Sequence, residues 1–108
     1  MPSPAQARLD ALVERLRPLH PRKIVLFGSA ARRDADELSD LDVVVVAEEM
    51  PRRFLDRIAR AYELLEPRYA LDILLYTPDE YDTMRADGNP LIAAVEREGR
   101  VLYERSAA

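Results

Sequence analysis

Apolar and polar residues along the chain follow two different periods, and the change from one period to the other outlines the elements. Apolar residues three and four positions apart, as at Leu9, Leu12 and Leu16, indicate helices, whereas short continuous apolar runs indicate buried strands. The expected helices cover residues 4–17, 30–35, 51–66, 78–86 and 90–98. The expected strands cover residues 24–27, 41–46, 71–76 and 101–103. This order, without an internal repeat or linker, predicts an α/β (α+β) domain with a small sheet.

Capping residues support several of these boundaries. Thr77-Pro78-Asp79-Glu80 has the spacing of a capping box, with proline at the first helical position. Gly88 is expected to stop that helix, Asn89 to start the next one, and Gly99 to end it. The run 41–46 is apolar on both faces of the pleat after Asp42, which predicts a central strand covered on two sides.

The helix over 51–66 has a clear apolar period. Its apolar positions are Phe54, Leu55, Ile58, Tyr62 and Leu65. This period predicts a face turned to the core, with Tyr62 and also Tyr76 in the core or at its edge. Three arginines of the same helix, Arg53, Arg57 and Arg60, share another face, and Glu49 and Asp56 precede two of them by four residues. A solvated, salt-bridged face is the main interpretation, and a docking surface for an acidic partner or nucleic acid is the alternative.

Composition narrows the class of protein. The sequence has 108 residues, of which 48% are apolar and 33% charged, and this predicts a single domain over 1–108. A net charge of −4 argues against a protein that binds duplex DNA through a broad cationic surface. Cysteine is absent, which excludes disulfides, thiolate metal sites and a cysteine nucleophile. No segment has the character of a signal peptide or membrane span, so we expect a soluble, cytoplasmic protein without membrane contact.

Three aspartates stand at the beginnings of expected strands. Asp40 and Asp42 are two residues apart, so their carboxylates point to the same side of the chain. Asp72 stands at the entrance of an otherwise apolar strand, where an unpaired buried charge would be costly. The neighbouring carboxylates of Asp40 and Asp42 repel each other unless a cation lies between them. The charge of Asp72 can be stabilised in three ways: by exposure at the strand end, by pairing with an arginine, or by binding a metal ion.

Magnesium suits the metal-binding alternative. It prefers carboxylate, water and phosphate oxygens, and a pair of such ions can activate an attacking oxygen and stabilise a leaving one. Gly28-Ser29 follows the first strand and opens a short helix, an arrangement that lets phosphate approach backbone amides. A site shared by this turn and the aspartates requires the first strand to be antiparallel to the second and the second parallel to the third. The expected mixed sheet therefore has the order one-two-three.

The residues around this turn resemble a known signature. Gly28-Ser29-Ala30-Ala31-Arg32-Arg33, five further residues, and Ser39-Asp40-Leu41-Asp42-Val43 are similar to GSxARGxxxxxSDxDL, without a gap. This is the signature of the minimal nucleotidyltransferases (MNT) of the DNA polymerase beta superfamily. The resemblance covers 24–76 and implies the polymerase-beta-like nucleotidyltransferase fold, with a short terminal strand added to the sheet. Arg33 replaces the usual glycine and Val43 a frequent leucine, and neither change removes a carboxylate.

The resemblance also implies roles for individual residues. Asp40, Asp42 and Asp72 would be the catalytic and metal-binding carboxylates and would hold two Mg²⁺ ions. The nucleotide-binding residues would be Gly28, Ser29, Arg32 and Ser39. Arg32 is about as well explained by an ion pair with the acidic residues that follow it. His20, the only histidine, is expected to lie in a surface loop and not to be a catalytic base.

The implied activity is transfer of a nucleoside monophosphate, AMP from ATP, to a hydroxyl acceptor. Related small proteins act as antitoxins that adenylylate a tyrosine of an all-helical HEPN-domain toxin, so the resemblance implies a HEPN partner and a nucleoside triphosphate. We expect no added helical domain for an acceptor, so the acceptor is expected to arrive on another molecule. The alternative is a non-catalytic module that neutralises a partner by contact. Both homo-oligomers and hetero-oligomers are compatible with the sequence.

Overall fold

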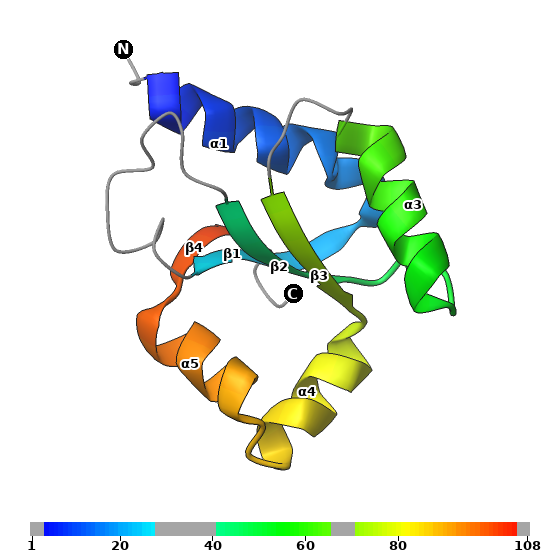
Figure 1. The fold of residues 1–108 in the computed structure, drawn as a ribbon, viewed down its shortest axis with the longest axis vertical. Helices are drawn as coiled ribbons and strands as arrows, with labels where there is room; N and C mark the ends of the chain where they lie inside the picture. Colours follow the sequence, from blue (N-terminus) through cyan, green and yellow to red (C-terminus); the bar gives the residue numbers. More distant parts are fainter. Residues whose placement is uncertain (1–3, 28–40, 66–70, 106–108) are drawn as a thin grey trace.

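The computed structural model describes residues 4–27, 41–65 and 71–105 and shows a four-stranded sheet between two pairs of helices (Figure 1). The helical elements are α1 (Pro4–Arg15), the 3₁₀ helix η1 (Arg17–Leu19), α3 (Phe54–Leu65), α4 (Pro78–Ala86) and α5 (Pro90–Glu98). The strands are β1 (Pro21–Phe27), β2 (Leu41–Ala47), β3 (Leu71–Tyr76) and β4 (Arg100–Glu104). No helix in these described ranges is long and apolar enough to cross a membrane.

The sheet has the topology that the shared site requires. Its strand order is β3-β2-β1-β4, with β1 antiparallel to β2 and β2 parallel to β3. The predicted order of the first three strands and their directions are thus confirmed. The terminal strand β4 adds to the free edge of β1 in an antiparallel direction, which leaves β3 as the opposite edge of the sheet.

The core lies on both faces of the sheet, and β2 contributes to each. One cluster joins α1 and α3 to the face that carries Val43 and Val45, and the other joins α4 and α5 to the face that carries Val44 and Val46. Each of these four valines is at most 3% exposed. The prediction of a central strand covered on two sides is confirmed, because helices pack against both of its faces.

Several boundaries differ from the expected ones, and α3 begins at Phe54, three residues after the expected start at Pro51. The helix α1 ends two residues early and is followed by η1, while β1 begins at Pro21, three residues before the apolar run. Pro21 pairs with Ala47 as the first residue of its strand, a position where a missing amide proton is tolerated. His20, exposed as predicted, closes η1 in the left-handed conformation, with φ of 53°. The expected helix over 30–35 lies outside the described residues.

The predicted capping residues hold the α4 and α5 helices in place. The capping box of Thr77 and Glu80 is present in both directions, and the side chain of Asn89 accepts bonds from two amides of the first turn of α5. Gly88 has a φ of 74°, a conformation that favours glycine. At Gly99 the reason is space: a Cβ atom would lie 2.5 Å from Cγ1 of Val25, so α5 can approach β1 closely.

The orientation of α3 is the main correction to the sequence analysis. Its buried residues are Arg57, Ala61 and Leu65, whereas Phe54, Leu55, Ile58 and Tyr62 are exposed. Tyr62 was therefore wrongly predicted as core, and Arg57 was wrongly placed on a solvated face; Tyr76 is half-buried, as expected for the core edge. The physical reason is that the guanidinium of Arg57 finds hydrogen-bond acceptors for its buried donors on Pro51, Leu75 and Glu80.

Candidate functional site

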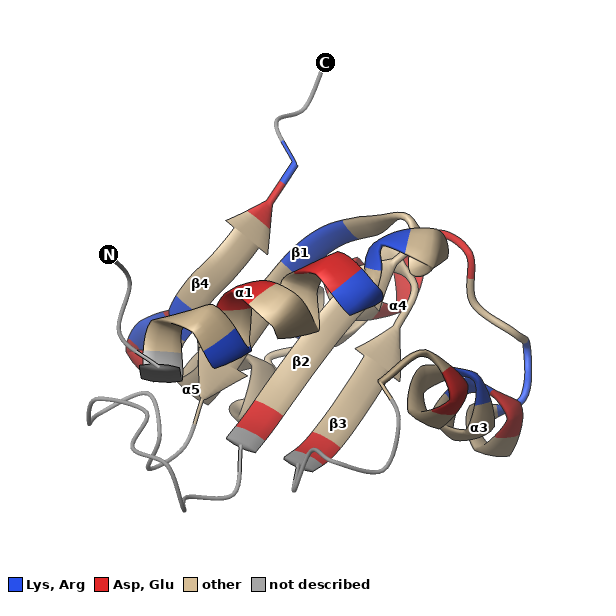
Figure 2. Cartoon of the chain, turned by 90° about the horizontal axis from the view of Figure 1, so that it is seen from above, with Lys and Arg blue, Asp and Glu red and all other residues tan. Residues whose placement is uncertain are grey.

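Two of the predicted carboxylates lie side by side at one end of the sheet. Asp42 and Asp72 are partners in the register between the parallel strands β2 and β3 (Figure 2, red segments where these strands begin). Neighbouring strands are about 4.8 Å apart, and paired residues direct their side chains to the same face. Asp72 is exposed and Asp42 is half-buried, so this end of the two strands lies at the surface.

The end of β1 meets the same edge. Phe27, the last residue of β1, is the register partner of Asp42. The end of β1 and the beginnings of β2 and β3 therefore meet at one edge of the sheet. The remaining predicted site residues, namely Gly28, Ser29, Arg32, Ser39 and Asp40, lie outside the described residues.

The charge arrangement suits a divalent cation. Paired carboxylates on adjacent strands repel each other, and the repulsion is relieved when a cation binds between them. No lysine or arginine forms an ion pair with Asp72 in the described part of the chain. Two accessible oxygen donors of this kind fit Mg²⁺. A group of three metal-binding side chains is not found in ranges 4–27, 41–65 and 71–105, since the third predicted ligand, Asp40, stands outside them.

The sheet makes this edge a rigid support. The residues that follow Asp42 along β2 are buried on both faces, and Leu75 near the end of β3 is 4% exposed. A carboxylate fixed at the end of such a strand loses little further freedom when it binds a metal, because the backbone is already ordered. The packed core therefore positions two charged groups at a solvent-accessible edge.

A second polar arrangement, which the sequence analysis missed, lies at the other end of β3. Arg57 of α3 donates to both carboxylate oxygens of Glu80, at 2.7 and 3.0 Å. The same guanidinium donates to the carbonyl of Leu75 at 3.1 Å and to that of Pro51 at 2.5 Å. Its side chain is only 4% exposed. Arg57 thus joins α3, the end of β3 and the first turn of α4.

The same contacts set the charge of Glu80. The hydrogen bond from Arg57 lowers the pKa of the Glu80 carboxyl. The amide of Thr77 adds to this effect, whereas partial burial opposes it.

The sequence does contain a signal for the buried face of α3. Arg57, Ala61 and Leu65 are four residues apart and form one row of the helix. The row through Phe54, Ile58 and Tyr62 is more apolar and suggested the wrong face.

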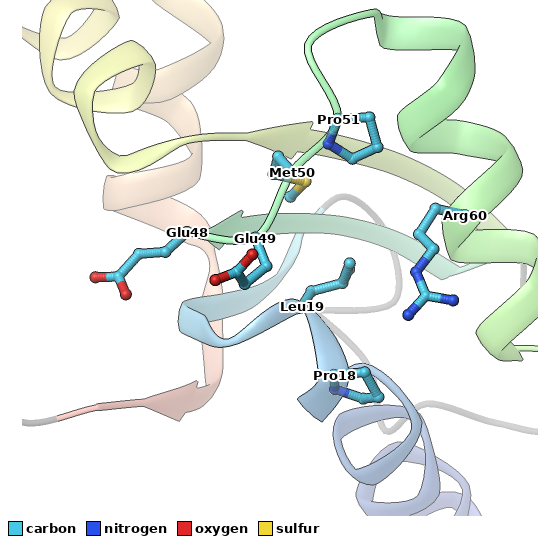
Figure 3. A pocket seen from close by; sticks show the side chains of 7 residues that line it. All are labelled: Pro18, Leu19, Glu48, Glu49, Met50, Pro51 and Arg60. Atoms are coloured by element: carbon cyan, nitrogen blue, oxygen red, sulfur yellow. The ribbon is translucent and has the colours of Figure 1, made fainter.

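The end of β2 carries an open pocket of about 370 Å³, far from the carboxylates along that strand (Figure 3). It is lined by Pro18, Leu19, Glu48, Glu49, Met50, Pro51 and Arg60. The side chain of Glu48 points away from Arg60 in this view and accepts a 2.7 Å hydrogen bond from Arg105, which lowers the pKa of Glu48. This ion pair joins the residue after β2 to the residue after β4, and we interpret it as a structural contact.

Comparison with known families and proteins gives consistent results. The family described as Nucleotidyltransferase domain matches residues 9–102. A protein of Methanocaldococcus jannaschii named as a protein adenylyltransferase is 33% identical over 76% of this chain and 58% of its own length. A second protein with that name from the same organism is 44% identical over 39% of this chain and 46% of its own length. The chain therefore spans only about half of each of these two relatives.

Solved structures show the same fold. A structure described as a nucleotidyltransferase from Sulfolobus solfataricus aligns with a TM-score of 0.59 and 20% identity, over 94% of this chain and 85% of that one. A toxin-antitoxin structure with AMP-PNP has a TM-score of 0.58 and 20% identity, over 91% and 74% of the two chains. A complex of tri-AMPylated Shewanella oneidensis HEPN toxin with MNT antitoxin gives 0.56 and 19%, over 94% and 73%. These likenesses show a nucleotidyltransferase fold of the polymerase-beta-like kind.

Proposed function

Because this chain belongs to the Nucleotidyltransferase domain family, we propose that it transfers AMP from ATP to a hydroxyl group of a partner protein, with the help of Mg²⁺. The observation that carries the proposal is the pairing of Asp42 with Asp72 at an accessible edge, beside the end of β1. The shared family and the adenylyltransferase names of the two relatives support the choice of reaction.

In the proposed reaction the acceptor oxygen forms a bond to the α-phosphorus of ATP. The bond from that phosphorus to the oxygen bridging the α- and β-phosphates breaks, and pyrophosphate leaves. The hydroxyl proton passes to a nearby carboxylate, for which the exposed Asp72 is our candidate. Most of the catalysis then comes from holding the acceptor and the phosphate in line and from balancing the charge that develops.

Each predicted site residue has a place in this scheme. Asp40, Asp42 and Asp72 would hold two Mg²⁺ ions, which when bound stabilise charge on the phosphate and lower the pKa of the attacking hydroxyl. Gly28 and Ser29 would receive the triphosphate on the backbone after β1. Arg32 and Ser39 would add further contacts to the phosphates. The edge formed by Phe27, Asp42 and Asp72 is where these segments begin or end.

The acceptor we propose is a tyrosine of a HEPN-domain protein, with this chain as its antitoxin. The support is the complex of an AMPylated HEPN toxin with an MNT antitoxin among proteins of this fold. A tyrosine hydroxyl suits the reaction, since its pKa near 10 makes the phenolate accessible beside a metal. If the chain binds a partner but does not bind ATP with Mg²⁺, the alternative of a non-catalytic neutralising module takes its place.

The test uses labelled ATP, Mg²⁺ and the HEPN-domain protein encoded next to this chain. We expect label on the partner with the wild-type protein and none with Asp40→Asn/Asp42→Asn or with Asp72→Asn. Asp82→Asn is the matched control, because Asp82 is an exposed aspartate of α4 outside the proposed site. Transfer of label that persists in the Asp40→Asn/Asp42→Asn variant contradicts the mechanism.

A further inference from the structure

The helix α3 exposes an apolar surface that a folded monomer would normally bury. Leu55 is 80% exposed, Phe54 59%, Tyr62 46% and Ile58 37%. At one hundred degrees per residue these four side chains fall within about a third of the helix circumference, and therefore form one continuous face. We call these four residues the α3 face. Apolar patches of this kind on soluble proteins mark interaction sites.

The contacts of Arg57 hold α3 in a rotation that leaves the α3 face exposed. A rotation of the helix that buried the α3 face would move Arg57 away from the carbonyl of Leu75 and the carboxylate of Glu80. That rotation would leave buried hydrogen-bonding groups without partners, which is costly. Burial of Arg57 and exposure of the α3 face are therefore two consequences of one arrangement.

The surface continues onto the neighbouring strand. A hollow of about 180 Å³ lies between α3 and the edge strand β3, lined by Phe54, Arg57, Ile58 and residues 73–76. On the side toward α4 a second hollow of about 370 Å³ is lined by Phe54, Tyr76, Asp79, Glu80, Thr83 and Met84. Phe54 lines both of them. A partner can thus place apolar side chains on either side of this ring, as hot-spot residues do in pockets.

Charge at one end of this surface favours an acidic partner. Arg52 and Arg53 directly precede α3, are both exposed, and make no side-chain ion pair within the described ranges. Of the two acidic residues that line the second hollow, Glu80 is paired with Arg57, so Asp79 is the one acidic residue there that the two arginines must outweigh. On the helix itself, Asp56 and Glu63 lie on the side away from the α3 face. Unpaired cations beside an apolar stripe complement acidic groups beside an apolar stripe on a partner.

The direction of α3 connects this surface to the candidate site. The helix leads from the end of β2 back to the beginning of β3, so its last turn and Asp72 lie at the same end of the sheet (Figure 1). A partner element that lies along α3 from Phe54 to Tyr62 therefore points toward the edge where Asp42 and Asp72 are paired. This placement favours a partner that carries the acceptor hydroxyl.

We propose that the α3 face docks an amphipathic helix of the HEPN-domain partner, with apolar residues on its contact side and acidic residues flanking them. The identity of the partner rests on the function proposed above. The four side chains expose roughly 450 Å² if each offers about 200 Å². That area is more than half of the ~800 Å² that each partner contributes to a standard interface, so a helix docked here can form its main contact.

The test compares Leu55→Glu/Tyr62→Glu with Val101→Glu. Val101 is another exposed apolar residue, 49% exposed, on β4 at the opposite edge of the sheet. For the neighbouring HEPN-domain protein we expect the α3 variant to raise Kd at least about 10-fold and the control less than about 3-fold. Arg52→Glu/Arg53→Glu should also weaken binding, and the loss of affinity should be larger at low salt than at high salt. Unfolding temperatures close to that of the wild type show that each variant is folded.

Three results would overturn this proposal. The first is equal binding by the wild type and Leu55→Glu/Tyr62→Glu, or no binding by the wild type. The second is a wild-type chain that is dimeric alone, by light scattering, and becomes monomeric in that variant, because a second copy then covers α3. The third is unchanged AMP transfer in that variant, which leaves the proposed function standing without this docking surface. Loss of binding in the variant, with no AMP transfer by any form, supports the surface and refutes the activity.

Discussion

Arg57 and Glu80 form a bidentate ion pair that holds α3 against the beginning of α4. The guanidinium reaches both carboxylate oxygens, at 2.7 and 3.0 Å, and its side chain is almost completely buried. The guanidinium also donates to the carbonyls of Pro51, Leu75 and, at 3.5 Å, Arg52. An arginine in such surroundings is stable only while every partner is in place, so this pair determines the rotation of α3.

Replacement of Arg57 should therefore cost much of the stability of the domain. We expect Arg57→Met to lower the free energy of unfolding by about 2–4 kcal/mol, because it removes buried hydrogen bonds and leaves Glu80 without its cation. The control is Arg60→Met, whose ion pair with Glu63 is exposed at 3.7 Å and should be worth less than about 1 kcal/mol. Urea unfolding measures both, and equal losses would contradict the central role of Arg57.

The pair also predicts how stability depends on acid. The pKa of Glu80 is lowered in the folded protein, mainly by Arg57, whereas in the unfolded chain it is near 4.3. The unfolded chain therefore takes up this proton first as the pH falls. The stabilisation is complete above the unfolded pKa and is lost as the pH falls through the folded one. Unfolding free energies between pH 6 and 3 should fall less for Glu80→Gln than for the wild type, and an equal fall in both proteins would contradict the role of this pair.

Tyr81 predicts a second dependence, at alkaline pH. Burial, and then the carboxylate of Glu96 that accepts a 3.0 Å bond from the phenol, raise the pKa of Tyr81 to about 12. In the unfolded chain the pKa is about 10, so the unfolded form loses this proton first. The contribution is complete below about pH 10 and is lost as the pH rises toward 12. Tyr81→Phe should be less stable at pH 7 and less sensitive between pH 9 and 11; parallel curves would contradict this assignment.

Gly99 is expected to resist substitution for reasons of space. A Cβ atom at Gly99 would lie 2.5 Å from Cγ1 of Val25 in the core of the sheet, so Gly99→Ala should cost about 1–3 kcal/mol. Gly88→Ala is the comparison, because Gly88 has open space around it and a φ of 74°. Its cost should be about 1 kcal/mol, from backbone strain alone. Thermal unfolding shows which variant loses more stability. A larger loss for Gly88→Ala than for Gly99→Ala would contradict the close approach of α5 to β1.

Asp72 should be dispensable for folding and needed for the effect of Mg²⁺. Removing one of two neighbouring charges relieves repulsion, so Asp72→Asn should be at least as stable as the wild type in the presence of EDTA. Millimolar Mg²⁺ should raise the unfolding temperature of the wild type and have a smaller effect on this variant, since a ligand stabilises only the form that binds it. Asp82→Asn should respond to Mg²⁺ as the wild type does. An equal response of Asp72→Asn would remove Asp72 from the metal site.

Sequence patterns alone were enough to predict the order of the first three strands and the edge that carries the carboxylates. Apolar runs located β1, β2 and β3, and the need to bring Asp42 and Asp72 to one edge predicted their order and directions correctly. Local chemistry was equally informative at Thr77 and Asn89, because a cap depends on residues within one helical turn. These features were predictable because their partners are close in sequence or are fixed by strand periodicity.

The rotation of α3 and the position of β4 beside β1 became visible only in the folded chain. Along α3 the row of Phe54, Ile58 and Tyr62 and the row of Arg57, Ala61 and Leu65 both have helical spacing, so periodicity gives no unique inner face. The choice depends on a carbonyl 18 residues away, that of Leu75, and on the carboxylate of Glu80, 23 residues away. Polar partners so distant in sequence leave no periodic signal, so periodicity does not reveal that the most apolar side of α3 faces outward.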